Sequence, residues 1–381
     1  MAFYLAFKEI WRNKGRFFLF SLVIALITVL VLFIAALAQG LAEANKEYLE
    51  KINAQLIVFQ SKVDLSTVAS RIGWDKLNDI RRVPGVKEIG PIGFANGSII
   101  FGTGEKPLEV SLIGAEPGKP GMPAVISGID IRSPRGYLAV IDGNIAKRTN
   151  IQIGDEIVLK TIQGSKDQFN KVKVIGITDG RQYFYQPAIF LPFETWDKIR
   201  PQPVANPGSE QVANVIAVQL QNPADYPAMA KQIENQVSDV EVVDPKTAYQ
   251  AAPGYQAQQS TLNTQRGFTL LIGILVIGGF FQIQTLQKVP QIGVLKAVGT
   301  TNRSVAIAII LQIVIVSILG VIIGTLGTLG LTLALPAGIP IVIAGNTALI
   351  AILTLLLIGP IGGMVSVRLA LRVEPLRALG M

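Results

Sequence analysis

The sequence contains four long apolar segments without a single charged residue. The first, FFLFSLVIALITVLVLFIAALA, covers residues 17–38, and the others cover residues 267–286, 304–333 and 347–367. A helix needs about 20 apolar residues to cross a bilayer. We therefore predict four transmembrane helices at residues 17–39, 267–287, 304–333 and 347–367. This limits the fold more strongly than any other feature of the chain.

The composition agrees with a membrane protein and excludes several kinds of site. Charged residues make up 16% of the 381 residues, whereas about 25% is usual in soluble domains. The chain has no cysteine and no histidine. Disulfides, common zinc sites and nucleophiles built from cysteine or histidine are therefore excluded. We predict no catalytic residue and no metal ligand in this chain.

The net charge of +8 does not indicate nucleic-acid binding, because the positive charge is confined to the ends of apolar segments. Residues 40–265 hold 23 basic and 24 acidic residues. The remaining residues hold 11 basic and 2 acidic ones. A nucleic-acid-binding domain would carry a basic patch on its folded surface.

The basic residues predict the orientation of the chain. They lie in three short segments: Lys8, Arg12, Lys14 and Arg16; Lys288, Lys296 and Arg303; and Arg368, Arg372 and Arg377. Short basic segments stay in the cytoplasm. We therefore expect a multi-pass protein of the cell (inner or plasma) membrane with cytoplasmic residues 1–16, 288–303 and 368–381. Residues 334–346 would form a short outer loop.

The region between the first two spans, residues 40–266, is predicted to be a large extracytoplasmic α+β domain on helical stalks. Short β-branched runs occur at residues 54–60, 98–102, 108–116, 137–142, 155–162, 171–179, 188–193 and 214–220. Glycine, proline, asparagine and aspartate separate them, as is typical of strands and turns. Residues 222–240 predict a helix, and residues 41–52 are expected to prolong the first span.

The segment QKVPQIGVLKAVGTTNRS, residues 287–304, predicts a short basic helix between two spans. Pro290 suits a first helical turn, and Gly299 suits a helix end. Ile292, Leu295 and Val298 would lie along one side, while Lys296 and Arg303 remain available to polar partners. Either the segment is only a basic loop that happens to be helical, or it lies at the membrane surface and docks a cytosolic protein.

No nucleotide site is predicted in this chain. The phosphate-binding motif GxxxxGK[ST] is absent, and its nearest approach, GAEPGKP at residues 114–120, is one residue short and ends in proline. We interpret it as a turn. An external enzyme using serine and lysine or two carboxylates stays an alternative, although no spacing singles out a site.

Three segments resemble FtsX/MacB-type (type VII) ABC transporter permeases. VPQIGVLKAVGTTNRSV, residues 289–305, is similar to their (R)EIGxxKAxGa segment. AFKEIWRNKGRFFLF resembles their amphipathic helix before the first span, and VRLALRVEPLRALGM resembles their closing tail. The usual Arg-Glu before Ile-Gly is replaced here by Pro290 and Gln291, so an ion pair of that glutamate with an ATPase is not carried over.

The resemblance implies a non-catalytic permease that works as a homodimer with a separate cytosolic ABC ATPase. ATP and magnesium would be bound by that ATPase, and this chain would need no cofactor. The residues expected to couple the two proteins are Gln291, Ile292, Gly293, Leu295, Lys296, Val298 and Gly299.

Residues 5–10, 30–45 and 49–60 are most similar to HrtB-like permeases, which implies haem as a possible substrate. Without histidine, oxygen or sulfur atoms would have to bind the iron. Glu43, Glu47 and Tyr48 follow the first span and are the candidate substrate-binding residues.

Other members of the family imply other functions. MacB-like and Lol-like permeases imply export of peptides, antibiotics or lipoproteins, with an external adaptor. FtsX itself implies a signalling scaffold that activates an external cell-wall hydrolase.

Overall fold

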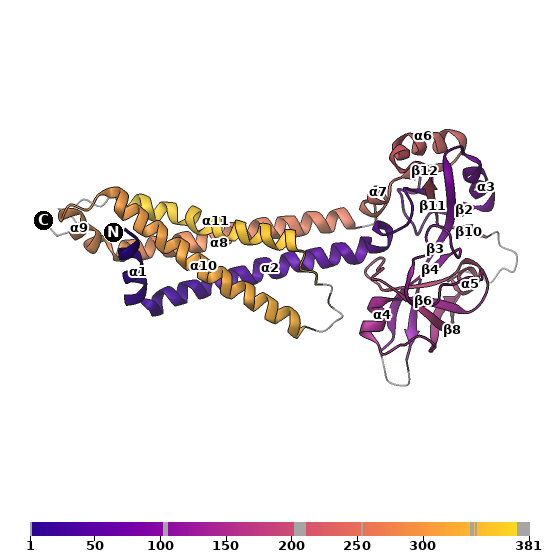
Figure 1. Cartoon of the computed structure of the whole chain (residues 1–381), viewed down its shortest axis with the longest axis horizontal. Helices are drawn as coiled ribbons and strands as arrows, with labels where there is room; N and C mark the ends of the chain where they lie inside the picture. Colours follow the sequence, from indigo (N-terminus) through magenta and orange to yellow (C-terminus); the bar gives the residue numbers. More distant parts are fainter. Residues whose placement is uncertain are drawn as a thin grey trace. The chain divides into compact units, whose positions relative to one another are not determined.

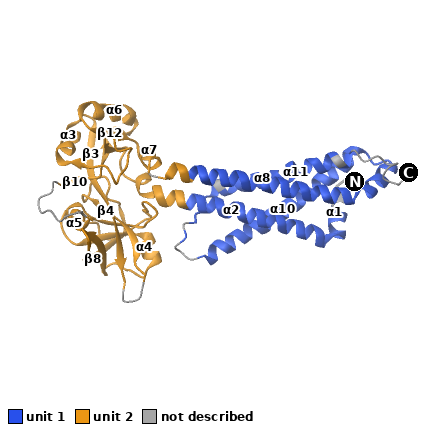
Figure 2. Ribbon diagram, turned by 180° about the vertical axis from the view of Figure 1, so that it is seen from behind, with its two compact units in different colours: residues 1–40, 259–381 blue, residues 41–258 orange. Residues whose placement is uncertain are grey.

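The computed structural model describes residues 2–101, 106–201, 211–252, 254–335, 339 and 341–371. The chain divides into two compact units (Figure 2). Unit 1 holds residues 1–40 and 259–381, and unit 2 holds residues 41–258.

Unit 1 is built from long helices (Figure 1). Their bounds are α1 Ala2–Arg12, α2 Lys14–Glu50, α8 Tyr255–Gln287, α9 Val289–Ala297, α10 Asn302–Ala334 and α11 Gly345–Leu371. In the described residues, α2, α8, α10 and the 348–368 part of α11 are long and apolar enough to cross a membrane. Each contains one of the four spans predicted from the uncharged segments.

Glycines allow the helices of unit 1 to approach closely. A Cβ atom added at Gly320 of α10 would lie 2.6 Å from Ile24, and one at Gly324 would lie 2.5 Å from Thr28. Both neighbours belong to α2. Similarly, a Cβ at Gly278 of α8 would lie 2.8 Å from the carbonyl oxygen of Gly362 in α11. Small residues at these crossings let two backbones meet, as is common between membrane helices.

Unit 2 is a mixed α/β domain. Its strands are β1 Leu56–Gln60, β2 Ile72–Gly73, β3 Val86–Ile100, β4 Leu108–Ala115, β5 Val125–Gly128, β6 Leu138–Asp142, β7 Glu156–Gln163, β8 Lys166–Thr178, β9 Ala188–Pro192, β10 Val212–Ala213, β11 Val215–Leu220 and β12 Val240–Val243. Its helices are α3 Trp74–Arg82, α4 Gly143–Arg148, α5 Phe193–Ile199, η1 Pro223–Asp225, α6 Tyr226–Gln236 and α7 Pro245–Gln250. This domain lies in sequence between the first and second spans, as predicted.

Six strands of unit 2 pair in a closed ring. β3 pairs with β4, β4 with β9, β9 with β6, β6 with β8, β8 with β7, and β7 returns to β3. β3 is long enough to serve two partners on one side, because β11 pairs with its first half and β7 with its end, while β4 pairs along its other side. The ring therefore continues into an open sheet of order β3, β11, β1, β12.

Side-chain alternation in the open sheet separates two cores. In β1, Leu56 and Val58 pack with α3 and α6, through residues such as Ile80 and Ile233. Ile57 and Phe59 point the other way, into a core that includes Tyr48 and Leu49 at the end of α2. Successive residues of a strand face opposite sides, so five residues of β1 are enough to serve both cores.

The expected helical stalks are present. α2 continues to Glu50, where Lys46 and Glu50 form an i,i+4 ion pair of 2.9 Å, and α8 begins twelve residues before the predicted second span. The run predicted at residues 98–102 is only the end of β3. Most of the predicted tail, including Arg372 and Arg377, lies outside the described residues.

Candidate functional site

The segment that joins the second and third spans folds as a short helix, α9. Pro290 occupies its first turn, where a missing N–H costs no hydrogen bond. Gly299 follows with a φ of +99°, a left-handed conformation that suits glycine. Thr301 then begins α10, because its hydroxyl accepts a hydrogen bond from the Ser304 N–H at 3.3 Å.

One side of α9 is fixed to the neighbouring helices. Ile292 is 6% exposed and packs with Val305 of α10 and Ala370 of α11. The Lys296 ammonium donates hydrogen bonds to the carbonyl oxygens of Ala370, at 3.1 Å, and Leu371, at 2.9 Å. The expectation that Lys296 stays available to polar partners was wrong. The last carbonyls of a helix lack intrahelical partners and attract a cation.

The other side of α9 is exposed and largely apolar. Val294 is 47% exposed, Leu295 is 38% exposed and Val298 is 82% exposed, and Gln291 is exposed beside them. The predicted stripe of Ile292, Leu295 and Val298 is thus divided, since Ile292 faces inward. Gly293 is buried. We call Gln291, Val294, Leu295 and Val298 the α9 surface.

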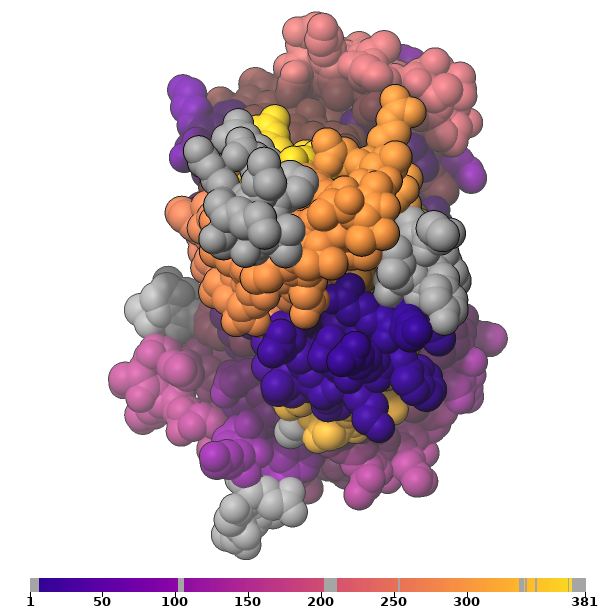
Figure 3. Space-filling view, turned by 90° about the vertical axis from the view of Figure 1, so that its left-hand side faces the viewer, coloured from indigo at the N-terminus to yellow at the C-terminus, as the bar shows by residue number. Residues whose placement is uncertain are grey.

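The start of α9 is joined to α1 and α10 by a polar network. Lys288 forms an ion pair with Glu9 of α1, and Gln312 of α10 donates a hydrogen bond to Glu9 at 2.6 Å. Arg16 donates to the Gln287 side chain at 3.1 Å. Figure 3 shows the first helices of the chain in indigo beside the α9 segment in orange. Sequence reasoning missed this network, although Glu9 is the single acidic residue before Glu43.

A cavity of about 80 Å³ with a mostly apolar lining lies beside this network, between α8, α9 and α10. Gln284 lines it, is 5% exposed, and its amide nitrogen and oxygen have no partner among the described residues. Buried polar groups of this kind are usually satisfied by water. The cavity beside Gln284 is large enough to hold such water.

The three candidate substrate residues are not gathered into one open site. Glu43 pairs with Lys46 at 3.3 Å. Glu47 pairs with Lys51 at 2.9 Å and accepts a hydrogen bond from the Gln182 N–H at 3.1 Å. Tyr48 is 1% exposed, and its hydroxyl donates to the Gly121 carbonyl at 2.8 Å. Tyr48 therefore supports the core of unit 2 in this conformation, and only the glutamates remain near the surface.

Asp142 is a buried carboxyl group near Glu47. Its pKa is raised to about 6, mainly by burial and also by the charge of Glu47, although hydrogen bonds from the backbone N–H groups of Asn144 and Ala188 oppose the shift. Asp142 also caps α4 through Asn144. Among the described residues, no group of three or more acidic side chains could hold a metal ion.

We expect the stability of unit 2 to fall as the pH rises through about 6. The folded-state pKa of Asp142 lies above its unfolded value, so its protonated form stabilises the fold below about pH 4, and this contribution is lost as the carboxyl ionises. Between pH 5 and pH 7 the free energy of unfolding should fall by about 1 kcal/mol from this group. Denaturant unfolding of the purified full chain measures this difference. Asp142→Asn should remove this fall in the free energy of unfolding, whereas Asp75→Asn, at an exposed position of α3, should retain it. An unchanged fall between pH 5 and pH 7 in Asp142→Asn would contradict the attribution to Asp142.

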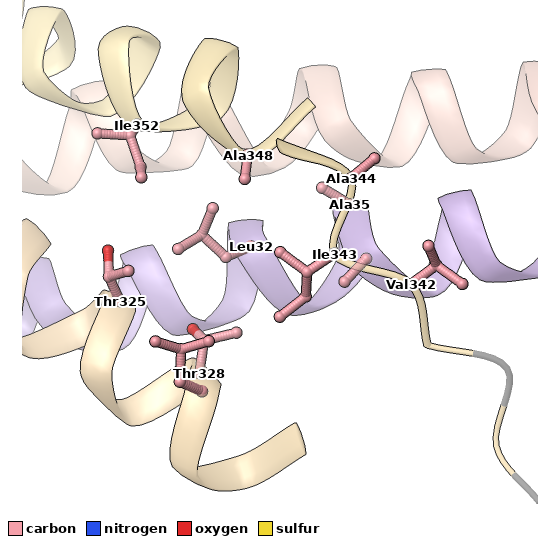
Figure 4. Close-up of a pocket in the computed structure, with 11 residues that line it drawn as sticks. Leu32, Ala35, Thr325, Thr328, Val342, Ile343, Ala344, Ala348 and Ile352 are labelled. Carbon is pink, nitrogen blue, oxygen red and sulfur yellow. The ribbon is translucent and has the colours of Figure 1, made fainter. Parts of the chain in front are cut away.

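A small apolar pocket lies between α2, α10 and α11 (Figure 4). Its volume is about 40 Å³, and the non-helical segment before α11 closes it, where the Val342 N–H bonds to the Ala36 carbonyl at 3.1 Å. The hydroxyls of Thr325 and Thr328 bond to carbonyls of their own helix. The pocket offers no free donor and is a packing gap rather than a substrate site.

Comparison with known proteins identifies both parts of the chain. Residues 17–236 match the MacB-like periplasmic core domain, and residues 267–375 match the FtsX-like permease C-terminal domain. Four apolar helices with a large mixed α/β domain between the first two define an integral membrane protein of the permease class. The chain belongs to the FtsX/MacB family of ABC transporter permeases, which are non-catalytic and act with a separate ATPase subunit.

Similar proteins include permeases with and without a stated substrate. A putative hemin transport system permease protein HrtB of Staphylococcus haemolyticus is 26% identical over 376 residues, which cover 99% of each chain. An uncharacterized ABC transporter permease of Mycobacterium tuberculosis is 23% identical and covers 80% of this chain and 78% of its own length.

Two solved structures also match parts of the chain, both at 14% identity and a TM-score of 0.36. The extracellular domain of the noncanonic ABC-type transporter YknZ from Gram-positive bacteria covers 50% of this chain and 100% of its own. The periplasmic region of MacB from Actinobacillus actinomycetemcomitans covers 54% and 95%.

Proposed function

We propose that this permease is the transmembrane subunit of an exporter, and that the α9 surface receives movement from a cytosolic ABC ATPase. The exposed apolar face of α9, on a helix whose other face is fixed, carries this proposal. Exposed apolar residues next to charged ones are typical of protein contact sites. A loop that only kept positive charge inside the cell would need neither the apolar face nor the fixed position.

The contacts of α9 provide a route for movement into the membrane helices. Lys296 ties it to the end of α11, Ile292 packs against α10, and the Lys288–Glu9 pair joins its start to α1. A displacement of the α9 surface would therefore move three helices together. α2 and α8 continue into unit 2. A rotation or tilt of α2 or α8 would therefore be transmitted to unit 2.

The proposed orientation places both termini and α9 in the cytoplasm and unit 2 outside. It is supported by Lys8, Lys14, Lys288 and Arg303 next to the apolar segments, because short basic segments remain cytoplasmic. We further propose a homodimer, since an ABC ATPase acts as a pair of subunits and offers two equivalent docking sites.

The substrate proposed for this exporter is an amphipathic molecule, with haem as the specific candidate. The hemin transport named for the staphylococcal relative supports this choice. Iron coordination here would use oxygen ligands, and of the three candidates Glu43 and Glu47 are the ones near the surface. Peptides, lipids or lipoproteins are the alternative cargo, and an external hydrolase would replace cargo in a signalling scaffold.

A hemin titration of the detergent-purified full chain tests this proposal. We expect a saturable shift of the Soret band at about one hemin per two chains, as a dimer with a shared site requires. The double variant Glu43→Gln, Glu47→Gln should weaken binding, while Glu241→Gln on β12 serves as the control. If hemin merely partitions into the detergent without saturation, haem is ruled out as the substrate. Capture of an external cell-wall hydrolase would favour the signalling scaffold.

A further inference from the structure

A cleft with a volume of about 670 Å³ lies in unit 2. Sites for small organic ligands are commonly about 300–1,000 Å³, so the cleft is large enough for such a molecule. One wall is the end of α2 and the residues after it, Lys51 to Asn53. The turn at residues 117–124 forms the opposite wall. It overlaps residues 114–120, the nearest approach to the phosphate-binding motif in this chain.

This turn is held rigidly in place. It contains Pro117, Pro120 and Pro123, and Gly121 has a φ of +105°. The Gly121 carbonyl accepts the hydrogen bond from Tyr48, and Lys119 forms an ion pair of 2.7 Å with Glu88. A wall that is already ordered loses little conformational freedom when a ligand binds.

Among the side chains that line the cleft, cations outnumber carboxylates. Its lining includes the cations Lys51, Lys119, Arg132 and Arg181 and the carboxylates Glu88 and Asp130. Three of the cations are already compensated: Lys119 by Glu88, and both Lys51 and Arg181 by Asp179. Arg132 is exposed and has no ion-pair partner within the part of the chain that the structure describes. An incoming acidic group would therefore meet an uncompensated guanidinium, which binds carboxylate or phosphate in a two-pronged geometry.

Apolar groups lie in the same cleft. Ile52 and Ile131 are buried beneath its surface, and Met122 packs partly against them. A ligand that satisfied both features would carry an acidic group next to an apolar body. The polar lining alone would suit any small anion, whereas this combination favours an amphiphile.

We infer that the cleft between the end of α2 and the 117–124 turn binds the acidic end of an amphipathic ligand, with Arg132 as the principal contact. This inference rests on the proposed export of an amphipathic substrate and gives unit 2 a direct part in holding it. The contact proposed here is made by the acid groups of the ligand. It is therefore distinct from coordination of the haem iron by Glu43 and Glu47.

Hemin and its dimethyl ester test this inference on the purified full chain, because esterification removes both carboxylate charges and leaves the porphyrin ring and the iron unchanged. We expect hemin to bind at least about tenfold more tightly than the ester, a ratio typical of one close charge pair. Arg132→Glu should remove this preference and Arg132→Lys should largely keep it. Arg82→Glu, with the same charge change on an exposed residue of α3, should behave as the wild type.

The outcomes separate this inference from the function on which it rests. Equal affinity for hemin and its ester, or an unchanged preference in Arg132→Glu, would contradict binding of the acidic end in the cleft. Either result would leave the proposal of haem binding intact. No saturable binding of hemin by the wild type overturns both the cleft and haem as the cargo. Loss of the preference in Arg132→Glu together with an unaltered thermal midpoint supports the cleft.

Discussion

Leu295→Asp in α9 should uncouple the ATPase from this permease without unfolding it. Leu295 is 38% exposed in the middle of the α9 surface and is not part of the buried cluster that packs Ile292 against α10 and α11. A carboxylate there would have to be desolvated in an apolar contact. Residues central to such contacts typically contribute 2 kcal/mol or more, so docking should weaken by roughly 30-fold.

The measurement is the ATP hydrolysis rate of the ABC ATPase that co-purifies with the wild-type chain, reconstituted with each variant. Val298→Asp should act like Leu295→Asp. The control Ile162→Asp places the same group on an exposed residue of unit 2 and should leave the rate unchanged. Normal stimulation by Leu295→Asp, with a normal thermal midpoint, would show that the α9 surface is not the docking site.

Gly299→Pro should uncouple the ATPase by a different route. Gly299 has a φ of +99°, which proline cannot adopt, and its N–H donates a hydrogen bond to the Lys296 carbonyl at 3.0 Å. Loss of this turn would change the position of α9 relative to the start of α10, so the same assay should report a loss of stimulation.

Gly324→Leu in α10 should have the largest effect on stability. A Cβ at this position would already lie 2.5 Å from Thr28 and 2.6 Å from the Ala25 carbonyl, so leucine would force α2 and α10 apart. Overpacking of this kind costs about 1–3 kcal/mol, and occasionally more. We expect a large fall in the thermal midpoint of the detergent-purified chain.

Gly330 provides the matched control for this substitution, since it lies on the same helix with nothing within 4 Å of an added Cβ. Gly330→Leu should retain the wild-type thermal midpoint. Equal midpoints for the Gly324 and Gly330 variants would contradict the close crossing of α2 and α10.

The spans could be predicted because the evidence for them is local. An uncharged run such as residues 17–38 has no stable alternative to burial in lipid or protein, whatever its neighbours are. The extension of α2 was also predictable, since residues 41–52 are helix formers that support Lys46–Glu50 and Glu47–Lys51 pairs.

The closed ring of strands in unit 2 could not be predicted in the same way. It depends on pairs such as Ser98 with Lys160, which lie far apart in the sequence and are chosen by the packing of the whole domain. The length of β3 was underestimated for the same reason. Its first half contains Gly90, Pro91 and Gly93, which indicate turns by local rules. Here Gly90 and Pro91 pair with β11, and Gly93 pairs with β4.

The limits of α9 were predicted from the sequence, but several of its side-chain contacts were not. Pro290 and Gly299 mark the limits of α9 because both act on the local backbone. The fate of Lys296 depended on the carbonyls of Ala370 and Leu371, more than seventy residues away. Glu47 and Tyr48 are neighbours in sequence, yet consecutive helical positions point in different directions, so one lies near the surface and the other in the core.

Labelling of single cysteines tests the central claim most directly, because the chain has no cysteine of its own. We would place one at Val298→Cys on the α9 surface and one at Ile162→Cys in unit 2, and treat oriented membrane vesicles with a maleimide that cannot cross the bilayer. The account predicts that Val298→Cys reacts only from the cytoplasmic side and is protected by the bound ATPase, while Ile162→Cys reacts only from outside. Reaction of Val298→Cys from the outer side would contradict the proposed orientation and docking site together.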